Sequence, residues 1–329
     1  MSERLHRVLS AAIACVLLVV AIMVLRREVA AVTWQALRAD LLRTPRRQLL
    51  LALGCTVGSY GALAGYDLLA FRYIRKTLPA PRIAVTAVLS YAVSNNVGFA
   101  MVSGASVRYR FYTRWGVTAK ELSHVVIAYS VTFWLGLFAL GGASLRSTPL
   151  AGVYGIPGGG SAPLLGWMLM ALPLAYILAT IVRRAPLRIG RWCLPLPSPA
   201  IALGQFAISA ADWALAGAAL YVLLPPGTLS FTLFLGPFFT AVLLGMISHV
   251  PGGVGVFEGL LVLMLRPYIS TTDLLPRLVV YRAVYFMLPL ALALAVLVTD
   301  ELRQRRARVR AADAARRSRA AAMTRPVPR

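Results

Sequence analysis

The chain has 329 residues, of which 59% are hydrophobic and 14% are charged, and its mean hydropathy is +0.74. A soluble domain of this length carries far less apolar sequence, so the composition excludes that class and indicates a multi-spanning membrane protein. The net charge of +23 would suit a nucleic-acid partner. The arginines, however, gather in loops and in the tail without interleaved aromatic residues, which favours a topology signal beside anionic lipid and no nucleic acid.

Apolar runs long enough to cross a bilayer, each near the ~20 residues that the hydrocarbon core requires, recur along the chain. They predict six full spans, at about residues 8–25, 49–70, 125–145, 164–182, 201–224 and 279–298. Two further apolar runs, at residues 83–102 and 230–265, contain polar or helix-breaking interruptions. We predict that these two are broken or re-entrant segments, because an irregular backbone inside a membrane is tolerated only where protein or a water-filled cavity encloses it.

The pattern indicates an all-α fold, a polytopic membrane helical bundle, in three parts. Residues 1–47 are predicted to form an N-terminal anchor helix and a basic loop, because the first apolar run is long for a signal peptide and ends in Arg26 and Arg27. Residues 48–300 form the membrane domain. Residues 301–329 form an Arg-rich tail, which we expect to be disordered and, by the positive-inside rule, cytoplasmic.

The two halves of the chain show the same order of features, which makes them candidates for inverted repeats. In each half a span with a lone Asp precedes a broken segment and then a cluster of Arg and Tyr. These features are Asp67, residues 95–98 and residues 108–112 in the first half, and Asp212, residues 251–255 and residues 281–285 in the second. Paired interruptions of this kind point to a transporter binding site. We therefore expect the N-terminus on the cytoplasmic side and two hairpins that enter the membrane from opposite faces. We also expect the spans at residues 49–70 and 201–224 to cross the membrane in opposite directions.

Glycines on the span at residues 49–70 indicate close helix packing. Gly54 with Gly58, and Gly61 with Gly65, form two small-xxx-small pairs. Such pairs let the backbones of neighbouring membrane helices approach one another. We interpret them as architectural.

Ionisable side chains within apolar segments are the candidate site residues, because a charge at the centre of a membrane helix costs about 2.5 to 3.5 kcal/mol and usually faces a bundle interior or a partner. The polar and helix-breaking residues of the two interruptions join them. The full set for binding or translocation is Asp67, Asn95, Asn96, Arg108, Arg110, Asp212, Ser248, Pro251, Gly252, Gly253, Gly255, Glu258, Tyr281 and Arg282.

Several of these residues also have a purely structural interpretation, which stays open. Glu258 sits at the start of a predicted helix, where a carboxylate can satisfy free backbone N–H groups. Asp67 and Asp212 can form salt bridges with loop arginines. Asn95 and Asn96 can hydrogen-bond between helices.

Signatures of enzymes, cofactors and metals are missing from the sequence. It contains no P-loop, HExxH or GxSxG motif. Cys15, Cys55 and Cys193 show no CxxC spacing and are odd in number, so neither a disulfide framework nor a metal site is indicated. No catalytic residue and no cofactor are therefore predicted, and a transporter is favoured over an enzyme.

With these residues in hand, the chain resembles the N-terminal flippase domain of the bacterial multiple peptide resistance factor, a lysylphosphatidylglycerol flippase/synthase, and the flippase-like membrane protein family around it. The resemblance covers roughly residues 49–300. It rests on four groups of residues, namely Ser248 to Glu258; Asn95 to Gly98 with Ser103-Gly104 and Arg108-Tyr109-Arg110; Asp212 to Leu215 with Tyr221 to Pro225; and Tyr281-Arg282 through Tyr285 to Pro289.

This resemblance implies a flippase of the bacterial cytoplasmic (inner) membrane. The expected cargo is an aminoacylated phosphatidylglycerol of lysyl or alanyl type, or a related lipid, moved from the inner to the outer leaflet with a gain in antimicrobial peptide resistance. Full-length family members also carry a soluble aminoacyl-tRNA-dependent synthase domain. Our expectation is that this chain has no such domain, so lipid aminoacylation is not implied. A homo-oligomer or a separate synthase partner is compatible with this picture.

The resemblance and the charges together suggest roles for the ionisable residues. The arginines would hold the lipid phosphate, namely Arg108, Arg110 and Arg282. A carboxylate would face a headgroup ammonium, namely Asp67, Asp212 or Glu258. The alternative function is a membrane-embedded enzyme, or an anchoring subunit for a separately encoded lipid-modifying transferase.

Overall fold

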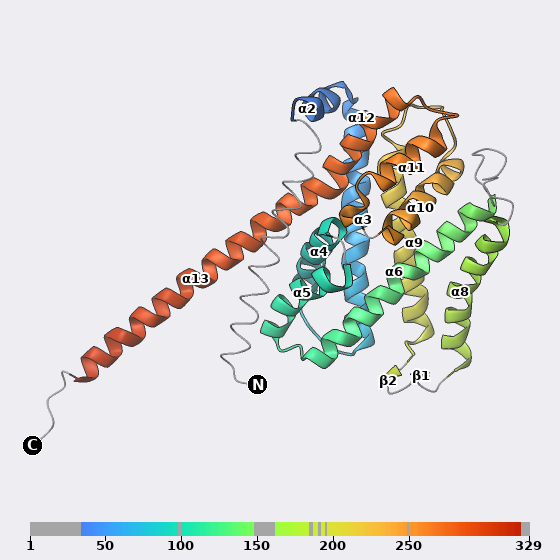
Figure 1. Cartoon of the computed structure of the whole chain (residues 1–329). Helices are drawn as coiled ribbons and strands as arrows, with labels where there is room; N and C mark the ends of the chain where they lie inside the picture. The colour runs from blue at the N-terminus through green and yellow to red at the C-terminus, as the bar shows by residue number, and fades with distance from the viewer. Residues whose placement is uncertain are drawn as a thin grey trace, which may run out of the picture.

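The computed structural model describes residues 34–97, 100–147, 162–183, 187–189, 192–194, 196–248 and 250–323, and within them the chain folds as the expected all-α bundle (Figure 1). The helices are α2 (Trp34–Arg43), α3 (Arg46–Tyr73), α4 (Ala80–Val97), α5 (Ala100–Tyr112), η1 (Thr113–Trp115), α6 (Ala119–Ser147), α8 (Ala162–Val182), α9 (Pro199–Tyr221), α10 (Phe231–Ile247), η3 (Pro251–Gly253), α11 (Val256–Leu265), α12 (Thr271–Tyr281), the π-helix η4 (Arg282–Met287) and α13 (Leu288–Met323). Between α8 and α9 a short antiparallel hairpin pairs β1 (Leu187–Ile189) with β2 (Trp192–Leu194).

The predicted spans correspond to long apolar helices. In the described part of the chain, five helical segments are long and apolar enough to cross a membrane, namely Arg46–Tyr73, Ala119–Arg146, Pro163–Val182, Pro199–Tyr221 and Thr271–Ala307. Four of them contain one predicted span each, and Pro199–Tyr221 covers the span predicted at residues 201–224 except for its last three residues. The remaining predicted span, at residues 8–25, lies outside the described residues.

The two interrupted runs form helical hairpins at opposite ends of the bundle. α4 packs against α5, and α10 packs against α11. Figure 1 shows the first hairpin beside the end of α3 at which that helix finishes, and the second hairpin near the opposite end of the bundle. α5 has 13 residues and α11 has 10. At 1.5 Å per residue these arms are about 20 Å and 15 Å long, too short for a ~30 Å hydrocarbon core, so each hairpin re-enters.

The central pair of helices, α3 and α9, runs in opposite senses, as inverted repeats require (Figure 1). Glycines set the distance between them. A Cβ on Gly58 would lie 3.1 Å from Leu215, and one on Gly65 would lie 2.9 Å from Ile208. A Cβ on Gly61 would meet nothing within 4 Å, and the same holds for Gly54. The packing face is therefore Gly58 with Gly65, seven residues or about two turns apart, and not the two four-residue pairs that we expected.

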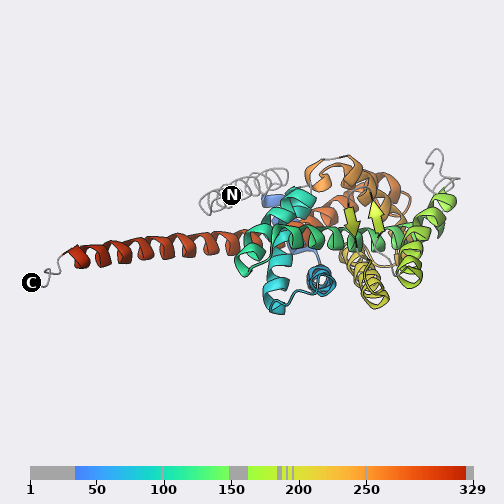
Figure 2. The same ribbon diagram turned by 90° about the horizontal axis from the view of Figure 1, so that it is seen from below.

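The tail is the main difference from the predicted organisation. α13 continues through Met323, into the segment for which we expected disorder, and Figure 2 shows it extending away from the rest of the bundle. Ala and Arg are among the strongest helix formers. An i,i+4 ion pair between Arg305 and Glu301, 3.1 Å apart, adds local support.

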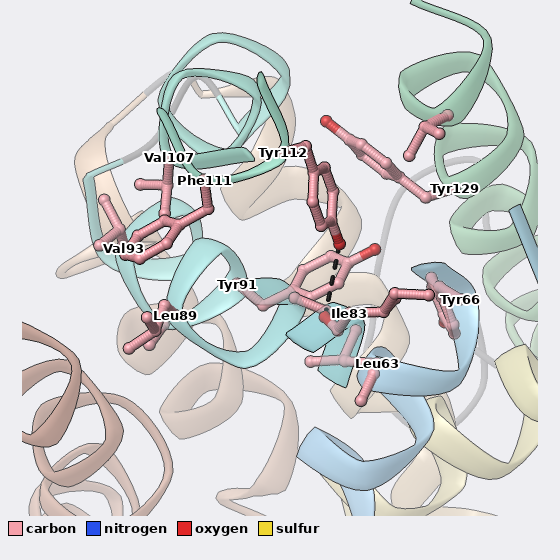
Figure 3. Close-up of a cluster of buried hydrophobic side chains, with 14 of the residues drawn as sticks. Leu63, Tyr66, Ile83, Leu89, Tyr91, Val93, Val107, Phe111, Tyr112 and Tyr129 are labelled. Carbon is pink, nitrogen blue, oxygen red and sulfur yellow. Dashed lines mark hydrogen bonds between the residues drawn. The ribbon is translucent and has the colours of Figure 1, made fainter. Parts of the chain in front are cut away.

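Buried aromatic residues hold the first hairpin against α3 and α6. Figure 3 shows Tyr112 of α5 pointing toward Ile83 of α4, and its hydroxyl donates to the Ile83 carbonyl at 3.4 Å. The rings of Tyr66 and Tyr91 meet edge to face with their centroids 5.9 Å apart, and so do those of Tyr91 and Tyr129. These contacts link the four helices α3, α4, α5 and α6, and they fix the hairpin beside the charged groups described below.

The crossing of α6 and α9 yields a first prediction. A Cβ on Gly136 would lie 2.5 Å from the backbone carbon of Ser209, so Gly136→Ala forces the two helices apart. We expect a loss of about 1–3 kcal/mol in the free energy of unfolding, the range for overpacked cores. The measurement is unfolding of the purified protein in detergent.

Gly61→Ala is the matched control, because its Cβ would enter open space and alanine has the higher helix propensity. It is expected to keep or raise stability. Equal stability of the two variants would contradict the described contact between α6 and α9.

Candidate functional site

Three glycines break the helix between α10 and α11. Gly252, Gly253 and Gly255 have φ values of 63°, 63° and 83°, in the left-handed region that side chains with a Cβ seldom adopt. The chain therefore turns back on itself at η3, with the Gly253 N–H donating to the Val250 carbonyl at 2.8 Å. Within the same segment, the Ser248 hydroxyl donates to the Gly245 carbonyl at 2.7 Å.

Glu258 and Arg282 close this break. One carboxylate oxygen of Glu258 accepts the Gly255 N–H at 2.7 Å, so the residue caps α11 as its structural interpretation anticipated. The other oxygen accepts from Nε of Arg282. Arg282 Nη2 also donates to the Gly252 carbonyl at 3.2 Å. Glu258 is thus both a cap and a counter-ion, and Arg282 joins the break to η4.

The tip of the first hairpin reaches the same π-helix. The side-chain amide of Asn96, at the end of α4, donates to the carbonyl of Ala92 at 2.8 Å and to that of Phe286 at 3.3 Å. Its neighbour Asn95 is half-buried at the same tip. η3 packs against α4 as well. Both interruptions therefore converge on η4, and π-helical turns of this kind occur often at functional sites.

A buried carboxylate lies beside this junction. Asp212 of α9 is 4% exposed, and it accepts from the Ser59 hydroxyl at 2.5 Å and from the Tyr66 hydroxyl at 2.8 Å. Ser59 Oγ is in turn 2.8 Å from the hydroxyl of Tyr285 in η4. Tyr285 stacks on Tyr281, with ring centroids 5.2 Å apart. Asp212 is thereby joined to η4 through one serine.

Asp67 and Arg108 neutralise each other. Arg108 Nε and Nη2 donate to the two Asp67 oxygens at 2.9 and 2.8 Å, and the Tyr112 hydroxyl adds a third bond at 2.6 Å. The two charged side chains are 0% and 1% exposed. The guanidinium carbon also lies 4.5 Å from the ring centroid of Tyr91 and 4.1 Å from that of Tyr129. This closed pair holds α5 against α3.

Arg110 lies apart from this junction, at the contact between α5 and α13. Its Nη2 bonds Asp300 at 2.9 Å and Glu301 at 2.8 Å, and Arg114 also reaches Asp300 at 3.0 Å. The expected arginine cluster is thus divided between an internal pair and a docking contact for α13.

The two remaining predicted residues have structural roles. The Tyr281 hydroxyl donates to the Ala216 carbonyl at 3.3 Å. Pro251 is the first residue of η3.

Several residues of the site were not selected from the sequence. Ser59 and Tyr66 are seven residues apart and share one face of α3, which is the signal that could have found them. Gly104 lies where a Cβ would be 3.0 Å from Arg108 Nη1, so it leaves room for the guanidinium. Among the residues that the structure describes, no group of three His, Cys, Asp or Glu side chains is arranged to hold a metal.

A family model described as "Lysylphosphatidylglycerol synthase TM region" matches residues 7–293. The chain belongs to this family. Two relatives that match the chain are of similar length. One is the uncharacterized protein slr0712 of Synechocystis, 34% identical, with the alignment covering 92% of this chain and 95% of the relative. The other is the inner membrane protein YbhN of Escherichia coli, 29% identical over 76% and 79%.

A longer relative is similar over part of its length. The phosphatidylglycerol lysyltransferase of Staphylococcus haemolyticus is 24% identical over 89% of this chain but only 34% of its own length. Membership of the lysylphosphatidylglycerol synthase TM region family confirms the resemblance drawn from the motifs. The described helices confirm that this member is a polytopic membrane protein.

The buried pair of Asp67 and Arg108 gives a second prediction. Asp67→Asn leaves Arg108 buried without its counter-charge, and breaking such a pair costs about 3–5 kcal/mol of unfolding free energy. The double variant Asp67→Leu with Arg108→Met removes both charges and is expected to recover most of that loss. Unfolding in detergent measures all three proteins.

Asp300→Asn is the control, because Asp300 is partly exposed and its ion pairs are at the bundle edge. A change below about 1 kcal/mol is expected there. The pairing would be wrong if Asp67→Asn were as stable as Asp300→Asn.

Proposed function

We propose that this protein is a phospholipid translocase of the bacterial inner membrane. Its cargo would be an aminoacylated phosphatidylglycerol of lysyl or alanyl type, or a related lipid, moved from the inner to the outer leaflet. Family membership supports lipid handling, since matched relatives are named phosphatidylglycerol lysyltransferases. The chain spans only a third of those relatives, so their transferase activity is not part of the proposal.

One observation carries the proposal, which is that two re-entrant hairpins from opposite ends of the bundle meet at one π-helix. A site at such a junction lies near the middle of the membrane, and each hairpin gives it a route to one leaflet. Small displacements of either hairpin tip from η4 would open the junction to one side at a time. This is the geometry that alternating access requires.

The ion pair at the junction matches the charges of the proposed cargo. An aminoacylated phosphatidylglycerol carries a phosphate and an ammonium group, and Arg282 with Glu258 presents the opposite charge for each. Exchange of the internal pair for a pair with the lipid keeps every charge neutralised during passage. Arginine suits the phosphate role because its planar donors match two phosphate oxygens.

Other polar groups at the junction complete the proposed lipid path. Asn95 and Asn96 lie at the tip of the first hairpin, where their amides suit glycerol hydroxyls or phosphate oxygens. The backbone around Gly252, Gly253 and Gly255 has no side chains to keep a headgroup away. Asp67 with Arg108, and Arg110 with α13, would instead hold the first hairpin and the tail in position.

The tail would fix the orientation of the protein. Arginines follow one another along the end of α13, and such a segment is retained on the cytoplasmic side, where it can contact anionic lipid. We therefore place the C-terminus in the cytoplasm.

A leaflet-resolved lipid assay in proteoliposomes tests the function. With lysylphosphatidylglycerol as the probe, the wild-type protein is expected to speed its movement between leaflets. Arg282→Ala and Glu258→Gln each leave an unpaired charge at the junction and are expected to slow it by at least about tenfold, the loss from one missing charged contact of ~1.4 kcal/mol or more.

Two control variants make the same changes away from the junction. Arg305→Ala and Glu121→Gln alter partly exposed ion pairs that lie away from η4, and both are expected to keep the wild-type rate. Unchanged translocation in both junction variants would refute their roles. A wild-type protein that alters the lipid composition of cells but not lipid sidedness would favour the alternative, a subunit of a lipid-modifying transferase.

A further inference from the structure

Asp212 differs from the other buried carboxylate of the central helices because no cationic partner faces it among the residues that the structure describes. Asp67 is paired with Arg108, and the half-buried Glu258 is paired with Arg282. Around Asp212, no lysine or arginine nitrogen of the described residues lies within 4 Å, and its hydrogen bonds come from hydroxyl groups. An ionised carboxylate in such surroundings is costly, because burial shields it from bulk solvent and no described counter-charge pairs with it.

The groups that face Asp212 come from several of the surrounding helices, and the hydroxyls of Tyr60 in α3 and Tyr281 in α12 also lie within its electrostatic reach. α3 contributes Ser59 and Tyr66, and η4 contributes Tyr285 through Ser59. On its own helix, Ser209 lies 3.2 Å from the Tyr66 hydroxyl. α4 contributes Tyr91, whose ring meets that of Tyr66. α6 contributes a backbone group, the Gly136 N–H, which donates to the Ser209 hydroxyl oxygen at 2.9 Å.

We propose that Asp212 binds and releases a proton during each transport cycle, so that a proton gradient drives lipid translocation. This inference rests on the proposed function and supplies its energy source. The proton enters from water on one side of the membrane, converts the carboxylate to the carboxylic acid, and leaves to water on the other side. No other bond is made or broken.

The hydroxyl groups around Asp212 accommodate both protonation states without moving heavy atoms. When Asp212 is ionised, the hydroxyls of Ser59 and Tyr66 both donate to it. When it is protonated, its own O–H donates to Tyr66. Tyr66 then donates to Ser209, and Ser209 donates to the Phe133 carbonyl at 3.4 Å. A rotation of hydroxyl hydrogens along this row therefore takes up the added proton.

The same hydroxyls connect the proton site to the lipid junction. Ser59 donates its hydrogen to Asp212 and accepts the hydrogen of Tyr285. Tyr285 belongs to η4, which also carries Arg282 and Phe286, the residues that hold the two hairpin tips. Protonation of Asp212 makes its carboxyl group a weaker hydrogen-bond acceptor for Ser59. This weakens the hydrogen-bonded chain from Asp212 through Ser59 to Tyr285, and with it the attachment of η4. The proton and the lipid thus act on one element.

Proteoliposomes containing the full chain and lysylphosphatidylglycerol test the coupling, with potassium and valinomycin to clamp the membrane voltage. In the wild type, a gradient of one pH unit is expected to shift the steady-state ratio of lipid between leaflets by up to about tenfold, the limit for one proton per lipid. A pH dye in the lumen is expected to report proton flux when lipid is added on one side.

Asp212→Asn keeps the hydrogen-bonding shape of the side chain but cannot exchange a proton. Its lipid ratio is expected to be the same with and without the gradient, and its proton flux is lost. Tyr66→Phe is the second variant, because it interrupts the hydroxyl row while keeping the ring, and it is expected to weaken the response to pH even if Asp212→Asn does not fold. Asp273→Asn, at an exposed helix start, is the matched control and should respond as the wild type does.

The outcomes separate this inference from the proposed function. A wild type that moves lipid without any response to pH, or that responds to a sodium gradient instead, refutes the proton site and leaves the translocase standing. A wild type that moves no lipid under any gradient refutes the translocase itself. A response to pH that survives in both Asp212→Asn and Tyr66→Phe assigns the coupling proton to another group and overturns the proposal.

Discussion

The need to satisfy backbone groups at membrane depth governs this structure. A helix that breaks inside a bilayer exposes N–H and C=O groups, and each costs several kcal/mol unless protein or enclosed water supplies a partner. Here the partners are side chains, from the same turn in one case and from distant segments in the others. Arg282 donates to the Gly252 carbonyl, Glu258 accepts the Gly255 N–H, and Asn96 donates to the Phe286 carbonyl. Because the polar groups that permit the breaks also join them, the two hairpins and η4 form one unit.

The sequence predicted the parts of the fold that depend on local composition. Span positions, the two interruptions and the opposite senses of α3 and α9 follow from hydropathy, Gly and Pro content, and repeated order. The partners of the charged residues could not be predicted in this way, because they depend on contacts between segments that are distant in the sequence. Asp67 and Arg108 are 41 positions apart, and the contact of Arg110 with α13 requires knowing where that helix passes.

Two further differences have the same origin in three-dimensional packing. Small-xxx-small spacing indicates that a helix can pack closely against a neighbour. Which of its glycines face that neighbour depends on the angle at which the two helices cross. Gly54 and Gly61 lie outside the interface. The tail was expected to be disordered from its charge. Its alanines and arginines nevertheless favour helix, and α13 extends the turns already begun by the membrane span before it.

The pseudo-symmetry of the two halves ends at their charge pairs, and this asymmetry defines the site. In the first half the arginine after the hairpin, Arg108, reaches back to Asp67 on the preceding span. In the second half the corresponding arginine, Arg282, reaches instead to Glu258 at the break. Asp212, the counterpart of Asp67, is thereby left among hydroxyl groups. One repeat becomes a fixed support, whereas the other holds an ion pair at the junction and a carboxylate beside it. A chain with two equivalent halves would have two closed pairs and no group available to change its charge.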